Sequence, residues 1–409
     1  MPRRRFSTWR LWGESPFSMD APRSWRLFAS TITSHEMNFR RRKKEEKRSR
    51  PVADGRDVAP NRQVLRKPFG LCRRACVAGL CVGLVLVLYL LSWPLVMLYV
   101  VHPPNLTETV QMRSFNVSIA GLHPSLHGLK VAQLTDIHFN DNNSVHLGAT
   151  DDILRQALDI VEQQEVDLVF LTGDYVDHWP ETASTLGRKW LSRLKSKHGV
   201  VAILGNHDYQ KPQSKRLVME AFATANITTL INAKAEPINE WLEVMGIGDL
   251  WEDYHPHRVM YPLPAPREVG EGSFRKARIV LTHNPDSAID LSRWGADLML
   301  AGHTHGGREC LAPGLRELWP LVNHLPEGVR RRIPGSRALK NWELSYGWID
   351  VPRPLPKGQA TLPPHEPGVV PLYVSSGLDR LPPRFLLCHA EVAVFTLVPA
   401  LSSGVHIPE

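Results

Sequence analysis

The chain has 409 residues, of which 43% are hydrophobic and 22% are charged. This length predicts two or three structural units, and the apolar content suffices for a large core, which excludes a wholly disordered chain. Residues 1–74 carry 20 Lys and Arg against 7 Asp and Glu, whereas residues 75–409 carry 29 against 34. The basic character therefore belongs to one end, and the acidic balance of the rest disfavours a nucleic-acid-binding protein. Five cysteines are too few for a disulfide framework, which leaves the redox compartment open.

The first segment, residues 1–66, is rich in Arg, Ser and Pro and has no hydrophobic periodicity. Such a composition predicts a basic, disordered tail. An Arg-rich and Ser-rich organelle presequence is the alternative that composition leaves open.

A long apolar run follows at residues 75–101, and the chain has no charged residue between Arg74 and Glu108. About 20 such residues span a bilayer, so we expect an uncleaved transmembrane anchor rather than a buried core helix. Basic residues flank its N-terminal side, which predicts a cytoplasmic N-terminus by the positive-inside rule. The protein is then single-pass, with everything after Val101 on the non-cytoplasmic side of the membrane.

From Leu129 onward, short β-rich apolar runs alternate with helical patterns, which predicts a layered α/β domain over residues 125–399. A helix is expected to begin after Thr150, because Asp151 and Asp152 would lie in its first turn. A second helical pattern occupies residues 185–197. Residues 308–370 are rich in Pro and Arg with little periodicity, which indicates an irregular excursion that is either a rim over the site or a plain loop.

Polar side chains recur where the expected strands end. They are Asp136, His138, Asp174, Asn206, His207, His283, His303 and His305. In an open α/β sheet this edge is the usual binding crevice. Alternation along a strand would put Asp136 and His138 on one side, and likewise His303 and His305. Glycines precede three of the motifs and let the backbone turn sharply there. Taken singly each residue suits a turn, but together they predict a metal site.

In chain order these motifs read LTDIHF, TGDYVD, LGNHDY, LTHNPD and AGHTHGG. They resemble the signature of the calcineurin-like metallophosphoesterase superfamily, and the membrane-anchored phosphoesterases within it most of all. The resemblance covers residues 129–397 and implies a four-layer α-β-β-α sandwich, here preceded by one transmembrane helix. After Gly307 the connection to Tyr373 is longer than the pattern predicts.

The resemblance also implies two divalent metal ions that share one carboxylate. One ion would be held by Asp136, His138, Asp174 and His305, and the other by Asp174, Asn206, His283 and His303. The mixed imidazole, carboxylate and amide set suits Mn, Fe, Zn, Co or Ni. His207 would stabilise the transition state or protonate the leaving oxygen, and the adjacent Asp208 would orient its imidazole.

The expected function is hydrolysis of phosphoester or pyrophosphate bonds by a metal-bridging hydroxide. About 28 residues separate Val101 from the first expected strand, which favours a lipid-linked substrate over a soluble one. The alternative is a non-catalytic membrane scaffold that retains the metal-stabilised fold. A nuclease is disfavoured by the charge balance and the anchor.

Overall fold

The structure is a computed structural model of the whole chain. It describes residue 83 and residues 109–141, 148–270, 272–307, 321–322, 324–330, 339–355, 361–362, 368–379 and 388–400. The chain divides into two compact units, Met1–Pro103 and Pro104–Glu409, and the account below concerns the second. The predicted tail lies outside the described residues, and so does the predicted anchor apart from residue 83. Within the described part, no helix has the length and apolarity needed to cross a bilayer.

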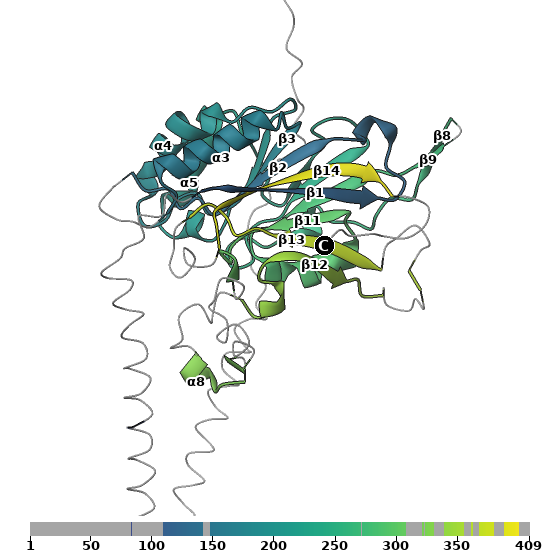
Figure 1. Cartoon of the computed structure of the whole chain (residues 1–409). Coiled ribbons are helices and arrows are strands. Elements are labelled where there is room, and N and C mark those ends of the chain that lie inside the picture. The colour runs from purple at the N-terminus through teal and green to yellow at the C-terminus, as the bar shows by residue number, and fades with distance from the viewer. Residues whose placement is uncertain are drawn as a thin grey trace, which may run out of the picture. The chain divides into compact units, whose positions relative to one another are not determined.

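The first of two large sheets has six strands in the order β1-β14-β2-β3-β4-β5. Their bounds are β1 Gln111–Ile119, β14 Glu391–Pro399, β2 Lys130–Leu134, β3 Leu168–Thr172, β4 Val200–Ile203 and β5 Thr228–Thr229. β1 runs parallel to β14, β14 runs antiparallel to β2, and the pairs from β2 to β5 are parallel. Figure 1 shows β1 and β14 side by side although they come from opposite ends of the unit.

The second sheet also has six strands, in the order β12-β13-β11-β10-β7-β6. Their bounds are β12 Gly347–Pro352, β13 Val369–Val374, β11 Leu298–Ala301, β10 Ala277–Leu281, β7 Leu242–Gly246 and β6 Ala233–Ala235. The four central strands are parallel, and both edge strands are antiparallel to their neighbours. A separate hairpin joins β8 (Arg267–Val269) to β9 (Gly272–Phe274).

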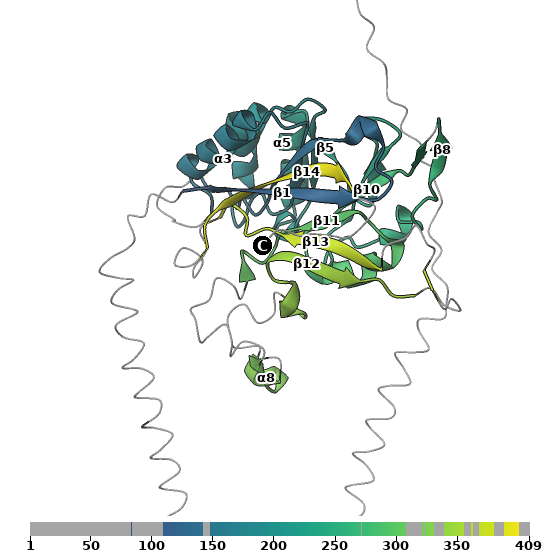
Figure 2. The ribbon, with the colours of Figure 1, turned by 45° about the vertical axis from the view of Figure 1, so that its right-hand side comes forward.

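Alternating side chains along the strands divide the apolar core into layers. In β3, Phe170 packs into the cluster between the two sheets, and its neighbour Leu171 packs into the cluster beneath the helices. In β10, Ile279 faces the first sheet while Val280 faces the outer helices of the second. Buried strands of this kind are apolar on both faces, as parallel sheets covered by helices require. The expectation of an α/β fold is confirmed, and Figure 2 shows the second sheet lying beneath the first.

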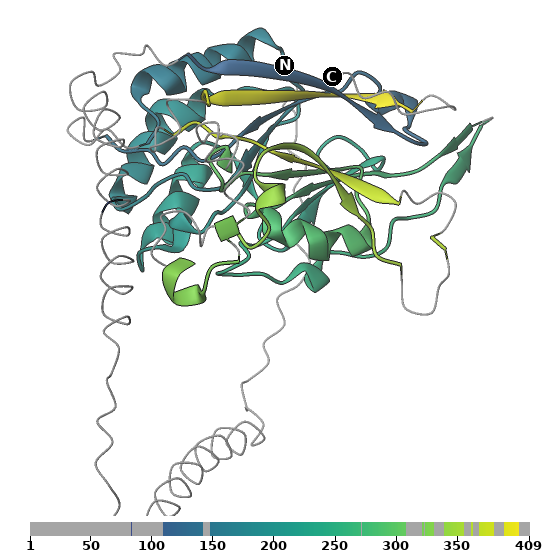
Figure 3. The same cartoon turned by 60° about the horizontal axis from the view of Figure 1, so that its bottom comes forward.

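Helices cover the outer faces of both sheets. The first sheet is covered by α3 (Asp151–Gln163), α4 (Ala183–Thr185) and α5 (Ser214–Thr224), and the second by α6 (Ala288–Leu291). A further short helix, α8 (Glu327–Arg330), has no buried side chain. Figure 3 shows the short green helical turns on the outer side of the second sheet.

Of the two predicted helices, one is confirmed and the other is not. α3 begins as expected, because the side chain of Thr150 accepts a hydrogen bond from Ile153 N at 3.3 Å. Its buried residues recur at helical spacing, and each fully buried Leu, Ile or Val stabilises the fold by roughly 1.5–3 kcal/mol. The pattern at 185–197 is not one helix. It divides into a π-helical turn at Leu186–Trp190 and a 3-10 turn at Leu191–Arg193.

Several strands lie where the sequence analysis placed none, and two of them lie at edges of the large sheets outside the regular alternation that the sequence showed. β1 precedes the expected start of the domain at residue 125, and β12 forms an edge of the second sheet from within the excursion at 308–370. β1 is an edge strand whose side chains are mostly exposed, so it lacks the apolar run that marks the central strands. Part of the excursion is therefore sheet rather than irregular loop.

Candidate metal centre

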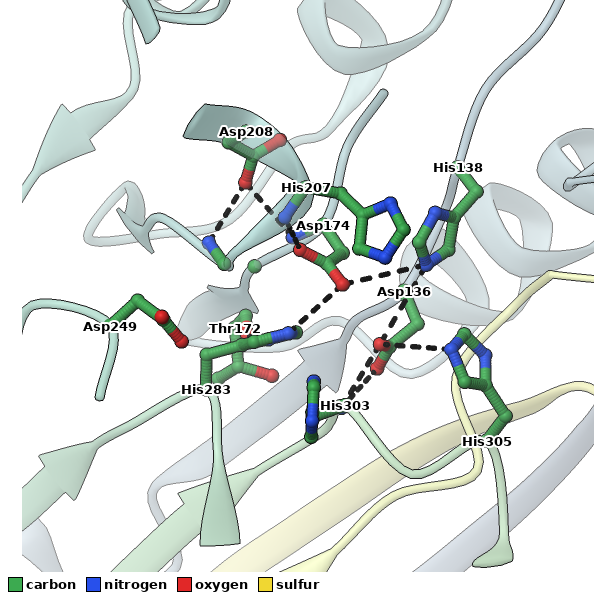
Figure 4. A network of polar contacts seen from close by, with 12 residues as sticks. Asp136, His138, Thr172, Asp174, His207, Asp208, Asp249, His283, His303 and His305 are labelled. Carbon is green, nitrogen blue, oxygen red and sulfur yellow. Dashed lines mark hydrogen bonds and ion pairs between the residues drawn. The ribbon is translucent and has the colours of Figure 1, made fainter. Parts of the chain in front are cut away.

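The candidate ligands follow five parallel strands whose carboxyl ends meet at one edge of the two sheets. β2 ends at Leu134 before Asp136, β3 ends at Thr172 before Asp174, and the same holds for β4, β10 and β11. The loops after these strands converge, and Figure 4 shows the side chains of Asp136, His138, Asp174, His207, His283, His303 and His305 pointing toward one another. The structure brings these side chains together at this edge.

Three groups of side chains in the described part of the chain could each hold a metal ion. One of them, His138, Asp177 and His207, contains His207 and its partner, and the other two contain only predicted ligands. Position A comprises Asp136, His138 and His305, and position B comprises Asp174, His283 and His303; the potential ligand atoms of each group lie within 4.8 Å of one another. Asp174 Oδ2 lies 3.6 Å from His138 Nε2 in position A and 3.0 Å from His283 Nε2 in position B. One carboxylate oxygen therefore faces ligands of both positions.

Several of the atoms that would coordinate metal are buried and make no hydrogen bond in the described part of the chain. Asp174 Oδ2, His138 Nε2, His283 Nε2 and the side-chain oxygen of Asn206 have no hydrogen-bond partner in the described part of the chain. Asp174 Oδ2 and His283 Nε2 instead lie 3.0 Å apart as an ion pair. Buried polar atoms without partners cost about 1–3 kcal/mol each, and carboxylate and imidazole atoms are good ligands for divalent cations. The residues present therefore fit divalent metal ions.

The ligands take an unusual backbone conformation. Left-handed φ angles occur at Asp136 (50°), His138 (45°), Asp174 (57°), His303 (72°) and His305 (51°). This conformation costs roughly 1–2 kcal/mol for a residue that has a Cβ. The argument from strand alternation was wrong, because β2 and β11 end before these residues begin. The paired ligands converge instead through left-handed turns, a form of strain that concentrates at functional sites.

Hydrogen bonds between the loops hold these turns in place. The amides of Ile137 and His138 both donate to the carbonyl oxygen of Asp174, at 2.9 and 3.0 Å. His303 N donates to both carboxylate oxygens of Asp136 at 3.0 Å, and His207 N donates to Asp174 Oδ1 at 2.8 Å. Because Asp174 Oδ1 accepts the hydrogen bond from His207 N, Asp174 Oδ2 is the carboxylate oxygen that faces both metal positions.

Two glycines permit this close approach. A Cβ at Gly205 would lie 2.2 Å from Asp174 Oδ1, and a Cβ at Gly302 would lie 2.3 Å from Asp136 Oδ2. Neither has the positive φ expected of a sharp turn, whereas Gly173 does, at 106°. Only Gly173 therefore serves the turning role that the sequence suggested, and the other two leave room for the ligand carboxylates.

His207 lies beside position A, with its ring 4.8 Å from that of His138. Its Nδ1 atom lies 2.7 Å from Asp177 Oδ1. Burial alone would lower the pKa of His207, but the hydrogen bond to Asp177 and the charge of Asp174 raise it to about 9. Divalent cations bound nearby would lower this pKa again by like-charge repulsion. The imidazole of His207 is thus held by Asp177 at the edge of position A.

Residues 129–307 match the calcineurin-like phosphoesterase family. This part of the chain is a calcineurin-like phosphoesterase domain. The match begins at β2 and ends just after His305, so it contains every candidate ligand.

Several curated bacterial proteins are similar to this chain. An uncharacterized metallophosphoesterase of Campylobacter jejuni is 32% identical over 206 residues, which is 50% of this chain and 50% of that protein. The phosphodiesterase YaeI of Escherichia coli is 35% identical over 44% of this chain and 61% of that protein. The UDP-2,3-diacylglucosamine pyrophosphatase LpxG of Chlamydia muridarum is 24% identical over 56% of this chain and 75% of that protein. The chain thus spans about half the length of the Campylobacter relative, and the likeness concerns a domain rather than the whole chain.

The role predicted for Asp208 in the phosphoesterase domain is corrected by its contacts. Its carboxylate is fully buried and accepts hydrogen bonds from the amides of Asp174, Tyr175 and Gly205, at 2.9, 2.9 and 2.8 Å. Burial and the charge of Asp174 raise the pKa of this carboxyl group. Asp208 therefore ties the loops after β3 and β4 together, and Asp177 is the residue that orients His207.

Three further residues beside the phosphoesterase site had no predicted role. His305 Nδ1 lies 2.7 Å from Oδ1 of the buried Asp379. Asp249, in the loop after β7, lies near His283 in Figure 4, and burial raises its pKa. Trp251 is 49% exposed and packs edge-on against the ring of His303. No spacing rule links these residues to the motifs, so only the fold reveals them.

The described part of the chain contains one cysteine. Cys388, just before β14, is disulfide-bonded. The other four cysteines of the chain lie outside the described residues.

Proposed function

We propose that this protein is a membrane-anchored phosphohydrolase that uses two divalent metal ions to cleave phosphodiester or pyrophosphate bonds. The observation that carries the proposal is Asp174 Oδ2, a buried carboxylate oxygen without a hydrogen bond that faces His138 of position A and His283 of position B. A shared carboxylate between two cations is the arrangement of two-metal phosphate hydrolases.

The bound cations would supply a water molecule of lowered pKa and neutralise charge on the phosphoryl oxygens. Residues of the chain position and transfer the proton. His207 reaches the phosphoryl group from the side of position A and donates a proton to the leaving oxygen. Asp177 accepts a hydrogen bond from His207 Nδ1, which keeps Nε2 directed at the substrate and stabilises the protonated ring.

The proposed substrate is lipid-linked. Similarity to LpxG, named for hydrolysis of a pyrophosphate in a nucleotide-linked diacylglucosamine, supports this class, and similarity to YaeI supports a phosphodiester bond. The apolar run at 75–101 would anchor the chain in the bilayer. Only nine residues separate Val101 from Gln111, a span of roughly 35 Å when extended, so the substrate would be met at the membrane surface.

The proposed orientation places the phosphoesterase domain on the non-cytoplasmic side. The basic residues before the apolar run favour a cytoplasmic N-terminus, and the disulfide at Cys388 favours an oxidising compartment for the domain. Protease treatment of sealed vesicles that carry a C-terminally tagged chain tests this orientation. We expect the tag to be protected from protease on the cytoplasmic side, and its digestion there would contradict the proposal.

Hydrolysis by the purified full-length protein tests the activity. Phosphomonoester, phosphodiester and pyrophosphate substrates, soluble and lipid-linked, should be compared for the wild type and for Asp174→Asn. We expect the wild type to cleave a diester or pyrophosphate and the variant to lose both bound metal and activity. Metal binding without turnover of any substrate would favour the alternative of a non-catalytic scaffold.

A further inference from the structure

The carboxylate of Asp379 lies behind the metal centre, outside the part of the chain that matches the phosphoesterase family. Its side chain is fully buried, and Oδ1 lies 2.7 Å from His305 Nδ1. The opposite ring nitrogen, His305 Nε2, lies 3.9 Å from Asp136 Oδ1. The imidazole thus stands between two carboxylates, one at position A and one behind it.

The segment that carries Asp379 is held by both sheets. Ser375 N donates to the carbonyl oxygen of Ala301 at the end of β11, and Leu378 N donates to that of Thr135 after β2, both at 3.0 Å. Glu391 N, at the start of β14, donates to the carbonyl oxygen of Gly377 at 3.1 Å. Because three strand ends fix this short segment, Asp379 has little freedom to move away from His305.

The two metal positions differ in how their imidazoles are supported. In position B, His283 Nδ1 lies 2.8 Å from the carbonyl oxygen of Thr172, a neutral acceptor. In position A, His305 Nδ1 faces a carboxylate oxygen of Asp379 at 2.7 Å. A carboxylate behind a ligand histidine fixes which nitrogen faces the metal and makes that nitrogen more basic, and its loss commonly weakens metal binding by about 10- to 100-fold.

We propose that Asp379 is a positioning residue for position A: it holds His305 with Nε2 toward the metal and strengthens metal binding there, not at position B. The inference rests on the two metal positions of the proposed function. It adds a residue that contacts neither metal nor substrate and acts through His305.

Cobalt binding by the metal-free full-length protein tests the inference without any substrate. We expect two binding steps in the wild type, of which Asp379→Asn weakens one by about 10- to 100-fold and leaves the other within about twofold. Asp379→Ser, which is smaller but still offers an acceptor, serves as a second variant should the amide fold poorly. Equal weakening of both steps, or no change in either, would overturn the inference.

A matched control and a spectroscopic signature separate positioning from general destabilisation. Glu243 in β7 is also fully buried and accepts a hydrogen bond from Arg278 Nε at 2.7 Å, away from the Asp379 segment, so Glu243→Gln should lower thermal stability without changing either cobalt step. In the proton NMR spectrum of the cobalt protein, the exchangeable His305 Nδ1 proton should be paramagnetically shifted in the wild type and exchange faster in Asp379→Asn. An unchanged exchangeable spectrum in that variant would contradict the inference.

The same titration distinguishes this inference from the proposed function. A wild type that binds no cobalt would overturn both. A wild type that binds two ions, with both steps unmoved by Asp379→Asn, would overturn the inference and leave the proposed function standing.

Discussion

The imidazole of His207 is oriented by Asp177, whose Oδ1 lies 2.7 Å from His207 Nδ1, and not by its chain neighbour Asp208. Asp177 comes from the loop after β3 and His207 from the loop after β4, so the pair exists only when these two strands lie side by side. The proton donor and the bridging carboxylate Asp174 are thereby fixed by the same two loops.

This pair predicts a graded series of activities. His207→Ala should keep both metals and lose about 10²-fold or more in kcat, because a positioned proton donor is removed. Asp177→Asn should lose less, and the double variant should be no worse than His207→Ala, because both changes act on one proton transfer. Steady-state kinetics with metal analysis of each variant checks the series.

His178→Ala is the matched control for that series. Its exposed ring lies 3.7 Å from the same Asp177 oxygen but outside the site, so its kcat should stay near that of the wild type. Additive losses in the double variant would contradict the shared role of His207 and Asp177.

Asp208 should affect stability rather than the proton donor. Asp208→Asn cannot accept all three backbone hydrogen bonds, and bonds to a charged group contribute about 1.5–3 kcal/mol each. We expect the free energy of unfolding to fall by about 3 kcal/mol, measured by urea denaturation, whereas Asp177→Asn should change it by less than about 1 kcal/mol. Equal stability of the two variants would argue against this division of roles.

Because Gly302 lies close to the Asp136 carboxylate, adding a single methyl group at this position should displace metal. Gly302→Ala would place a Cβ 2.3 Å from Asp136 Oδ2 and displace that ligand, so metal content at position A should fall. Gly368→Ala is the control, because nothing lies within 4 Å of its added Cβ. Elemental analysis of both proteins measures their metal content. Full metal content in Gly302→Ala would contradict this prediction and show that the loop can move aside.

Removal of metal should lower stability. Ligands that bind only the folded state stabilise it by about 2.7 kcal/mol at a free concentration 100-fold above Kd. A chelator should therefore lower the Tm of the wild type by roughly 5 to 10 °C. Differential scanning fluorimetry measures the change, and Asp174→Asn should show almost none. A chelator-insensitive wild type would contradict metal binding in the folded state.

The sequence was sufficient to predict which side chains meet at the site, because each lies within a few residues of an apolar run that forms a buried strand. Asp174 after VDLVFLTG and His283 after ARIVLT are the plainest cases. It was insufficient for contacts made across the fold. Asp379 reaches His305 only because β13 lies beside β11, and Asp208 acts on backbone amides that no side-chain motif marks. β1 escaped notice because an exposed edge strand carries few apolar residues.

The central claim is that Asp174 Oδ2 joins two metal ions, and electron paramagnetic resonance of the manganese-loaded full-length protein tests it most directly. Two ions that share a carboxylate lie roughly 3.5–4 Å apart, a separation at which their electron spins couple. The account predicts two bound manganese ions per chain with a spin-coupled spectrum in the wild type, and loss of that spectrum in Asp174→Asn. A wild-type spectrum of isolated, uncoupled manganese, or one that persists unchanged in the variant, would contradict it.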